Sequence, residues 1–318
     1  MTKTLLIATR SSELALRQAR QVQSALARAG VAAELKTYKT VGDKKLDEPL
    51  NAIGGKGLFT KELEVDLARG AVDCCVHSLK DLQTELPEGL AIGAIVGRED
   101  PRDVLIVNSV TGATSLQDLP RGSRVGTSSL RRRAQLLALR SDIEVVALRG
   151  NVPTRIRKVD EGQVHAAILA AAGVHRLGVS QRIACYLDAP VWLPAAGQGA
   201  IAVQIREDDE EMRGLLLPLH DSQASLQIRA ERAFLAALEG GCQVPIGALA
   251  LEHDGRLVLH GLIADLNGRH VVRGEHPVDA RNPELSGIRL ANELRGRGAS
   301  EILEGLRRAE QVPAPQPE

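Results

Sequence analysis

The sequence is poor in aromatic residues, which make up only 2% of its 318 positions. Proteins that hold single-stranded nucleic acid commonly stack its bases on aromatic side chains, so this composition argues against that class. The chain also lacks an excess of either charge, because 40 Lys and Arg residues balance 40 Asp and Glu residues. No overall field attracts polyanions, and any anion site must therefore come from local clustering.

Cysteine is also scarce, with four residues in the chain. None of them forms a C-x-x-C pair and no histidine cluster completes a ligand set, so we expect no metal site. Cys74 and Cys75 stand in an apolar run, where core packing explains them. The unbridged cysteines, and apolar runs too short for a signal peptide or a membrane span, lead us to expect a cytoplasmic protein that binds neither membrane nor nucleic acid.

The chain is longer than one ordinary domain core, and it alternates strands with helices from its start. Hydrophobic patterns predict strands at 4–9, 34–40, 71–78 and 90–96, and helices at 13–29 and 60–69. A charged segment at 98–103 marks a crossing to a second set, with strands at 104–107, 123–126, 143–148 and 166–171. This order predicts two α/β lobes with parallel sheets and a cleft. A turn at 194–199 precedes a strand at 200–205, which we interpret as the second strand of an interdomain hinge.

The pattern changes again after residue 245. Apolar stretches predict strands at 249–252, 257–263 and 270–274. Asp254-Gly255 and Asn267-Gly268 join them, and both pairs are strong hairpin signals. Helical patterns follow at 284–295 and 300–308. The sequence thus predicts a small α+β C-terminal domain with an antiparallel three-stranded sheet.

Arginines follow several strands of the second set. Thr127, Ser128 and Ser129 precede a helix whose first turn holds Arg131 and Arg132. Helix N-termini favour acids, so basic residues there fit best if an anion binds at that end. Further arginines stand just after strands or in the helices that follow them, at Arg149, Arg155 and Arg176. Because ligands bind at the carboxyl ends of parallel strands, we favour one convergent site for carboxylates or phosphates over scattered, solvated arginines.

Three further features bear on function. Lys80 and Asp81 follow the strand at 71–78 and form either a solvated turn or part of a site. In a site, the surrounding cations would keep Asp81 in its carboxylate form, and it could then stabilise a developing cation. The glycine-rich loop 41–57, which contains Lys56, is either a lid or an ordinary surface loop. Gly240, Gly241 and Pro245 end a helical pattern at 224–239 and predict a short, stiff loop carrying Cys242.

These residues leave three functions open. A transferase would build a polyanionic product on Cys242, with the arginines binding its charges. A non-catalytic two-lobed binding protein would capture a polycarboxylate ligand between its lobes. A nucleic-acid binder is the least supported of the three, given the zero net charge and the few aromatics.

The chain closely resembles the porphobilinogen deaminase (hydroxymethylbilane synthase) family from Ile7 to about Leu303. The motifs that carry this resemblance are Gly54-Gly55-Lys56-Gly57-Leu58-Phe59, Val76-His77-Ser78-Leu79-Lys80-Asp81, Arg98-Glu99-Asp100-Pro101-Arg102-Asp103, Val125-Gly126-Thr127-Ser128-Ser129-Leu130-Arg131-Arg132, Leu148-Arg149-Gly150-Asn151-Val152 and Glu239-Gly240-Gly241-Cys242-Gln243-Val244-Pro245-Ile246-Gly247. Their number and order make coincidence very improbable.

The resemblance implies a monomeric transferase of haem and other tetrapyrrole biosynthesis. It would condense four porphobilinogen molecules, with loss of ammonia, into the linear tetrapyrrole hydroxymethylbilane. Cys242 would hold a dipyrromethane cofactor through a thioether and act as its anchor. The implied fold has two periplasmic-binding-protein-like lobes, formed by residues 1–98 with 199–218 and by 99–198, and a third domain at 219–318.

The resemblance also assigns roles to single residues. Asp81 would be catalytic. The implied cofactor-binding set is Cys242, Lys80, Asp81, Thr127, Ser128, Ser129, Arg131, Arg132 and Arg155. The implied substrate-binding set is Arg10, Ser12, Arg149, Arg155, Arg176 and Gln198. Lys56 would belong to the lid, where Ala52 replaces a second lysine that some members carry.

Overall fold

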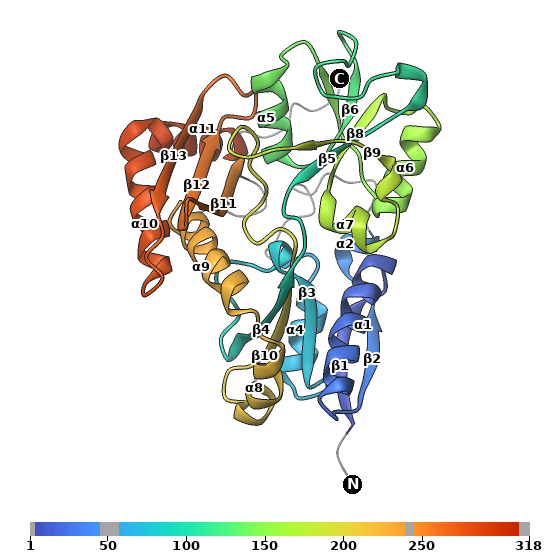
Figure 1. Cartoon of the computed structure of the whole chain (residues 1–318), viewed down its shortest axis with the longest axis vertical. Helices are drawn as coiled ribbons and strands as arrows, with labels where there is room; N and C mark the ends of the chain where they lie inside the picture. Colours follow the sequence, from blue (N-terminus) through green and yellow to red (C-terminus); the bar gives the residue numbers. More distant parts are fainter. Residues whose placement is uncertain (1–3, 45–56, 239–243, 312–318) are drawn as a thin grey trace.

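A computed structural model describes residues 4–44, 57–238 and 244–311 of the chain. These residues form two mixed five-stranded sheets and one three-stranded antiparallel sheet (Figure 1). The predicted fold class, two α/β lobes and a small α+β C-terminal domain, is therefore confirmed. Short helical elements not named below cover Val41–Lys44, Ser109–Thr111, Ser180–Arg182, Glu210–Leu216, Leu217–Leu219 and Arg295–Ala299.

The first sheet has the strand order β2-β1-β3-β10-β4. Its strands are β1 (Leu5–Arg10), β2 (Ala33–Tyr38), β3 (Cys74–Ser78), β4 (Leu90–Arg98) and β10 (Ala200–Arg206). β1 runs parallel to β2 and β3, so these three strands end at one edge. β10 is antiparallel to β3 and β4 and makes the sheet mixed, whereas we expected a parallel one. The helices are α1 (Glu13–Arg28), which buries Ala15, Ala19, Val22 and Leu26 along one face, and α4 (Lys61–Ala68).

The second sheet has the strand order β7-β6-β8-β5-β9. Its strands are β5 (Asp103–Val107), β6 (Arg124–Gly126), β7 (Glu144–Val146), β8 (Ala166–Ala170) and β9 (Ile183–Leu187). β6, β7 and β8 are parallel, so the helices that follow them begin at one edge, namely α5 (Leu130–Leu139), α6 (Val152–Asp160) and α7 (Ala171–Arg176). β5 is antiparallel to β8 and β9, so this sheet too is mixed.

The third sheet consists of β11 (Ile246–His253), β12 (Arg256–Ala264) and β13 (Val271–Pro277), paired in that order. Asp254 and Gly255 both have positive φ, 49° and 73°, as a tight hairpin turn requires. Both predicted hairpins are confirmed. Three helices cover the sheet or follow it: α9 (Ser222–Ala237), α10 (Pro283–Leu294) and α11 (Ser300–Gln311). Phe234 of α9 is fully buried in this core, and a side chain at Gly261 would collide with its ring.

A buried carboxylate on α9 connects the first sheet, the third sheet and the segment between the lobes. Glu231 is fully buried and accepts two hydrogen bonds from Arg98 at the end of β4, at 2.7 and 3.0 Å. It also accepts from the backbone N–H groups of Gly197, 2.8 Å away, and of Ala250 in β11, 2.9 Å away. One side chain thus holds α9 against the segment that joins the two lobes. In Figure 1, α9 lies beside that segment.

We expect Glu231→Gln to lower the free energy of unfolding by about 3–5 kcal/mol, because it leaves the Arg98 charge buried without its partner. Urea denaturation measures this loss. The matched control is Glu284→Gln. It breaks the ion pair that Glu284 of α10 makes with Arg229 of α9, the helix that also carries Glu231. Those two side chains are 43% and 50% exposed, so the control should lose less than about 1 kcal/mol. Equal losses in the two variants would contradict this account.

Candidate active site

Asp81 and Arg10 lie together at the edge where β1 and β3 end. The turn Leu79–Asp81 follows β3 directly and presents Lys80 and Asp81, and Arg10 is the last residue of β1. The Arg10 Nη1 and Asp81 Oδ2 atoms are 3.8 Å apart, with the two side chains 22% and 32% exposed. The Arg10 guanidinium also covers the ring of Phe59, with 4.3 Å from its carbon to the ring centroid. Asp81 is therefore a solvent-reachable carboxylate beside a cation, as its predicted role requires.

The second sheet contributes two buried arginines from the first turn of α5. The Ser129 side chain caps this helix by accepting from the Arg132 N–H, and the Thr127 hydroxyl accepts from the Ser129 N–H at 3.2 Å. Arg131 and Arg132 are both only 5% exposed, and both pair with Asp103, the first residue of β5. Their guanidinium groups are thus fixed by a carboxylate that we did not predict.

Gln198 joins the two sheets at this point. Its side-chain amide donates to Asp103 Oδ1 at 2.9 Å and to the Pro101 carbonyl at 2.7 Å. Its oxygen accepts from Lys80 Nζ at 3.2 Å. The pKa of Lys80 is lowered to about 8, mainly by burial and also by the charge of Arg132, while Asp81 and Asp103 partly oppose this shift. Lys80 from the first lobe therefore belongs to one electrostatic cluster with the Arg132–Asp103 ion pair from the second lobe.

Arg155 of α6 extends the cluster. Its Nε donates to the Gly150 carbonyl at 2.7 Å, and it makes no ion pair with any carboxylate in the described part of the chain. The pKa of Arg155 is lowered to about 10, mainly by burial and also by the charges of Arg132 and Arg149, while Asp81 partly opposes this shift. The charges of Arg132 and Arg149 from the second lobe and of Asp81 from the first lobe thus all act on Arg155.

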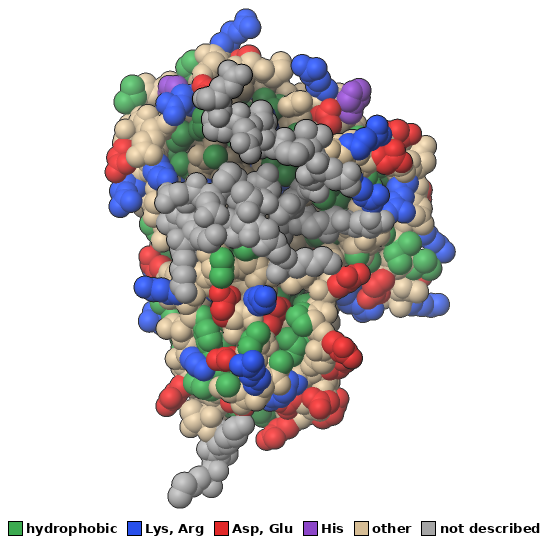
Figure 2. All heavy atoms as spheres, turned by 180° about the vertical axis from the view of Figure 1, so that it is seen from behind, with side chains coloured by type: hydrophobic (Ala, Val, Ile, Leu, Met, Phe, Trp, Pro, Cys, Tyr) green, Lys and Arg blue, Asp and Glu red, His purple; other side chains and the backbone are tan. Residues whose placement is uncertain are grey.

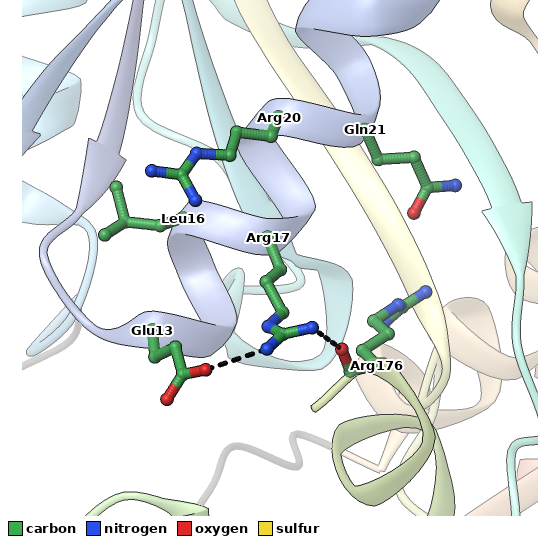
Figure 3. Close-up of a pocket in the computed structure, with 6 residues that line it drawn as sticks. All are labelled: Glu13, Leu16, Arg17, Arg20, Gln21 and Arg176. Carbon is green, nitrogen blue, oxygen red and sulfur yellow. Dashed lines mark hydrogen bonds and ion pairs between the residues drawn. The ribbon is translucent and has the colours of Figure 1, made fainter. Parts of the chain in front are cut away.

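Arg176, at the end of α7, lies apart from this cluster. Its side chain donates to the Gly199 carbonyl at 2.6 Å, and its own carbonyl accepts from Arg17 of α1 at 3.1 Å. It lines a surface groove of about 550 Å³ together with Glu13, Leu16, Arg17, Arg20 and Gln21 (Figure 3). This groove includes neither Asp81 nor Lys80. The structure thus places Arg176 at the junction of the lobes, and its substrate-binding role stays a prediction.

Two predicted hydroxyl groups serve the local backbone. Ser12 caps α1 by accepting from the Ala15 N–H, and the Ser128 hydroxyl donates to the Leu148 carbonyl at 3.1 Å. The predictions for Cys242 and Lys56 fall outside the described residues. No described helix is both long and apolar enough to cross a membrane. Likewise, the described His, Cys, Asp and Glu side chains form no group that could hold a metal ion.

A small pocket adjoins Asp81. It has a volume of about 20 Å³, close to that of one water molecule, and Arg10, Phe59, His77 and Asp81 are among its lining residues. Burial lowers the pKa of His77 to about 4, so this ring is neutral at physiological pH. Its Nε2 atom lies 3.0 Å from the side-chain oxygen of Gln204. The neutral ring adds no positive charge to the site, and the cationic character comes from Lys80 and the arginines.

Sequence reasoning missed Asp103, Phe59 and Trp192. Asp103 closes the charged segment 98–103 and opens a strand that is buried along Asp103–Ile106, and an acid at such a place was the available signal. Trp192 is the single tryptophan of the chain and donates its indole N–H to Asp103 Oδ2 at 2.8 Å. Phe59 was part of a motif, but no local pattern places its ring under Arg10.

The fold and the cluster define a two-lobed α/β protein whose lobes meet at a cationic site suited to a polycarboxylate. Charges of both signs are mixed over the face shown in Figure 2, so this positive character is local. A family model described as porphobilinogen deaminase, dipyromethane cofactor binding domain, matches residues 5–214, and a model of the porphobilinogen deaminase C-terminal domain matches residues 225–296. The chain belongs to the porphobilinogen deaminase family.

Relatives of known name agree with this assignment. The chain is 49% identical to porphobilinogen deaminase of Syntrophobacter fumaroxidans over 305 residues, which cover 95% of this chain and 98% of that protein. It is 51% identical to the Moorella thermoacetica enzyme over 303 residues, with 95% and 96% covered. Among solved structures, the methionine binding protein MetQ aligns with a TM-score of 0.44 and 14% identity over 74% of this chain and 94% of that chain. The fold assignment rests on the sheet topology described above.

We expect Lys80 to titrate near pH 8 when no carboxylate is bound to the cluster, because burial and neighbouring arginines disfavour its charged form. The full-length Cys242→Ser variant supplies such a chain, since it has no thiol at this position. Reductive ¹³C-methylation and NMR would follow the lysine signal, with Lys80→Arg identifying it and the exposed Lys61 as control. Lys80 should lose its proton as the pH rises through about 8, and a midpoint near the ordinary 10.5 would contradict the prediction.

Proposed function

We propose that this chain has hydroxymethylbilane synthase (porphobilinogen deaminase) activity. It condenses four porphobilinogen molecules, with release of ammonia, into hydroxymethylbilane in the biosynthesis of haem and other tetrapyrroles. The observation that carries this proposal is the cationic cluster around Asp81, in a chain that belongs to this family. The substrate and each successive product carry several carboxylates, so a site that holds them needs many cations and few acids.

The residues present fit a dipyrromethane cofactor. Lys80, Arg132 and Arg155 are partly or largely buried, and neither Lys80 nor Arg155 has a carboxylate partner among the described residues. Cations that are buried and make no direct ion pair suit a site that receives anionic groups. Cys242 would attach the cofactor through a thioether. The residues that would hold its carboxylates and pyrrole nitrogens are Lys80, Asp81, Thr127, Ser128, Ser129, Arg131, Arg132 and Arg155.

When bound, this cofactor supplies the pyrrole carbon that receives the first substrate unit. The remaining chemistry falls to the protein. Asp81 is partly exposed, whereas Asp103 is fully buried, so Asp81 is the acid of the cluster that a substrate can reach. Its negative charge stabilises positive charge that develops on the substrate as ammonia leaves. Arg10 holds the Asp81 carboxylate from the neighbouring strand, with 3.8 Å between their nearest charged atoms. Asp81 is therefore the catalytic residue of the proposal.

Substrate carboxylates would be bound by the cations around Asp81 and by residues at the junction of the lobes. The proposed set is Arg10, Ser12, Arg149, Arg155, Arg176 and Gln198, with Lys56 in a lid. Guanidinium groups suit this task because their planar forks match carboxylates in two parallel hydrogen bonds. Gln198 would act from the junction itself, since it already contacts residues of both lobes.

The same proposal includes the organisation of the chain. Residues 1–98 and 199–218 would form the first domain, 99–198 the second and 219–318 the third. The pairing of β10 with β3 and β4, and the hydrogen bond from the Glu99 N–H to the Gly199 carbonyl at 3.1 Å, support boundaries near 98 and 199. We also propose a cytoplasmic monomer. The free cysteines Cys74, Cys75 and Cys185 suit a reducing compartment.

Intact-mass measurement of the purified protein tests this function directly. A deaminase should carry extra mass from a covalent dipyrromethane, and it should consume porphobilinogen with release of ammonia. The alternative is a non-catalytic two-lobed binding protein for a polycarboxylate. In that case the mass would equal that of the bare chain, and porphobilinogen would remain unconsumed even if it bound.

A further inference from the structure

Asp103 is a fully buried carboxylate with an unusual number of partners. Its two oxygens accept hydrogen bonds from Arg131 Nη1 at 2.7 Å, from Arg132 Nε and Nη2 at 3.1 and 2.7 Å, from Trp192 Nε1 at 2.8 Å and from Gln198 Nε2 at 2.9 Å. Burial alone would raise the pKa of this carboxyl, but Arg131 and Arg132 hold it well below its usual range. Asp103 is therefore a permanent negative charge at the centre of the cationic cluster.

This charge determines where the two arginines point. Three of the five N–H donors of Arg132 are used by Asp103 and by the Ile168 carbonyl, at 2.9 Å. Arg131 uses two donors, one toward Asp103 and one toward the Leu193 carbonyl at 2.7 Å. These hydrogen bonds fix the two guanidinium planes, so only the N–H groups that they leave unused can donate to a ligand. Because the side chains are already ordered, ligand binding loses less conformational entropy.

The same carboxylate reaches the first lobe through Gln198. The amide of Gln198 donates to Asp103, and its oxygen accepts from Lys80, so the three residues form a chain from β5 to the turn after β3. The charged groups that act on Lys80 are Asp81 on its own turn, Arg131 and Arg132 on α5 and Asp103 on β5. Asp103 lies in the same lobe as the two arginines, and its negative charge opposes their lowering of the Lys80 pKa.

We propose that Asp103 is the positioning residue of this site, which aims Arg131 and Arg132 and, through Gln198, keeps Lys80 able to receive a carboxylate. The inference rests on the proposed function only for the identity of the ligand. It assigns Asp103 no contact with substrate or cofactor. Its effect is transmitted by the two arginines in one lobe and by Lys80 in the other.

The sign of the electrostatic effect follows from the charges. Asp103 raises the pKa of Lys80, so its neutralisation in Asp103→Asn lowers that pKa below about 8. A fall of one unit would reduce the protonated fraction of Lys80 at pH 8 from about a half to about a tenth. A neutral amine cannot form a charge-assisted pair with a carboxylate. Relative to the parent chain, Asp103→Asn should thus weaken anion binding about fivefold more at pH 8 than at pH 6.

The test measures the Lys80 titration by ¹³C-methyl NMR in full-length Cys242→Ser and in the same chain with Asp103→Asn. We expect the midpoint to move down by about one pH unit. With Cys242 intact, Asp103→Asn should also reduce the fraction of purified chains that carry the covalent adduct, as intact mass would show. The matched control is Asp100→Asn, since Asp100 pairs with Arg102 in the same segment and makes no contact with Lys80. It should leave both readouts unchanged.

Two measurements keep the outcome clear if Asp103→Asn is unstable. Trp192, buried and unique, reports by its emission wavelength whether the Asp103 region is still folded. Gln198→Met breaks the link to Lys80 without uncovering a buried charge, and it should also lower the Lys80 midpoint. An unmoved midpoint in folded Asp103→Asn and in Gln198→Met would overturn the proposal. Absence of an adduct in the unmodified chain would instead refute the proposed function, and the Lys80 titration would still test Asp103.

Discussion

Replacing Cys242 with serine is expected to abolish both the covalent adduct and the consumption of porphobilinogen. A thioether forms from a thiolate, and a serine hydroxyl is a far weaker nucleophile at neutral pH. The intact mass of Cys242→Ser should therefore equal that of the bare chain. We expect no measurable turnover, because the proposed function needs the anchored primer.

The other three cysteines cannot replace Cys242 as the point of attachment. Cys74 and Cys75 are fully buried in the first lobe; burial raises the pKa of Cys74 to about 12 and that of Cys75 well above its ordinary value. Burial also raises the pKa of Cys185, which lies in β9. Cys185→Ser is thus the matched control and should keep the full adduct mass. A remaining adduct in Cys242→Ser would contradict the assignment of the anchor.

The sequence predicts local structure well wherever the signal is local. Asp254-Gly255 specifies its own tight turn, and the apolar face of α1 is visible in the spacing of Ala15, Ala19 and Val22, all of which are buried. The start of α5 just after the hydroxyl residues 127–129 is another such case. Each of these signals depends on residues a few positions apart, so no knowledge of the tertiary structure is needed.

Strand partners are a different matter. An apolar run at 200–205 predicts a strand, but nothing in those residues indicates that it inserts antiparallel between β3 and β4. Both of these partner strands lie more than 100 residues earlier in the chain. β9 escaped prediction because its five residues are mostly half-buried and show no clear alternation. Sheet order depends on contacts between distant segments, and local pattern carries little information about them.

The candidate site also has a part that local sequence signals predict and a part that depends on distant contacts. Strand ends predicted that Arg131, Arg132, Arg149 and Arg155 would converge at one edge of the second sheet, because parallel strands present their carboxyl ends there. The same argument included Arg176, whose side chain instead reaches the Gly199 carbonyl. Asp103 was not predicted, since its partners Arg131, Trp192 and Gln198 come from three separate segments. A residue whose role is to hold others has no pattern of its own.

Asp81→Ala is expected to lower kcat/KM for porphobilinogen by about 100- to 1,000-fold, the usual effect of removing one group that stabilises transition-state charge. The fold should survive, because the Arg10–Asp81 pair is partly exposed and contributes at most about 1 kcal/mol to stability. Asp81→Asn keeps the size of the side chain but removes its charge, so it should be almost as slow as Asp81→Ala. Asp81→Glu keeps the charge and should retain more activity than either.

Single-turnover measurements separate chemistry from binding in these variants. In Asp81→Asn, adducts that carry additional pyrrole units should form slowly, and intact mass would resolve them one unit at a time. The Arg10, Arg149 and Arg155 cations remain, so substrate affinity should fall much less than the rate. If Asp81→Asn instead turned over normally while its affinity collapsed, Asp81 would bind substrate without stabilising the developing cation, and the charge that assists ammonia loss would have to come from elsewhere in the site.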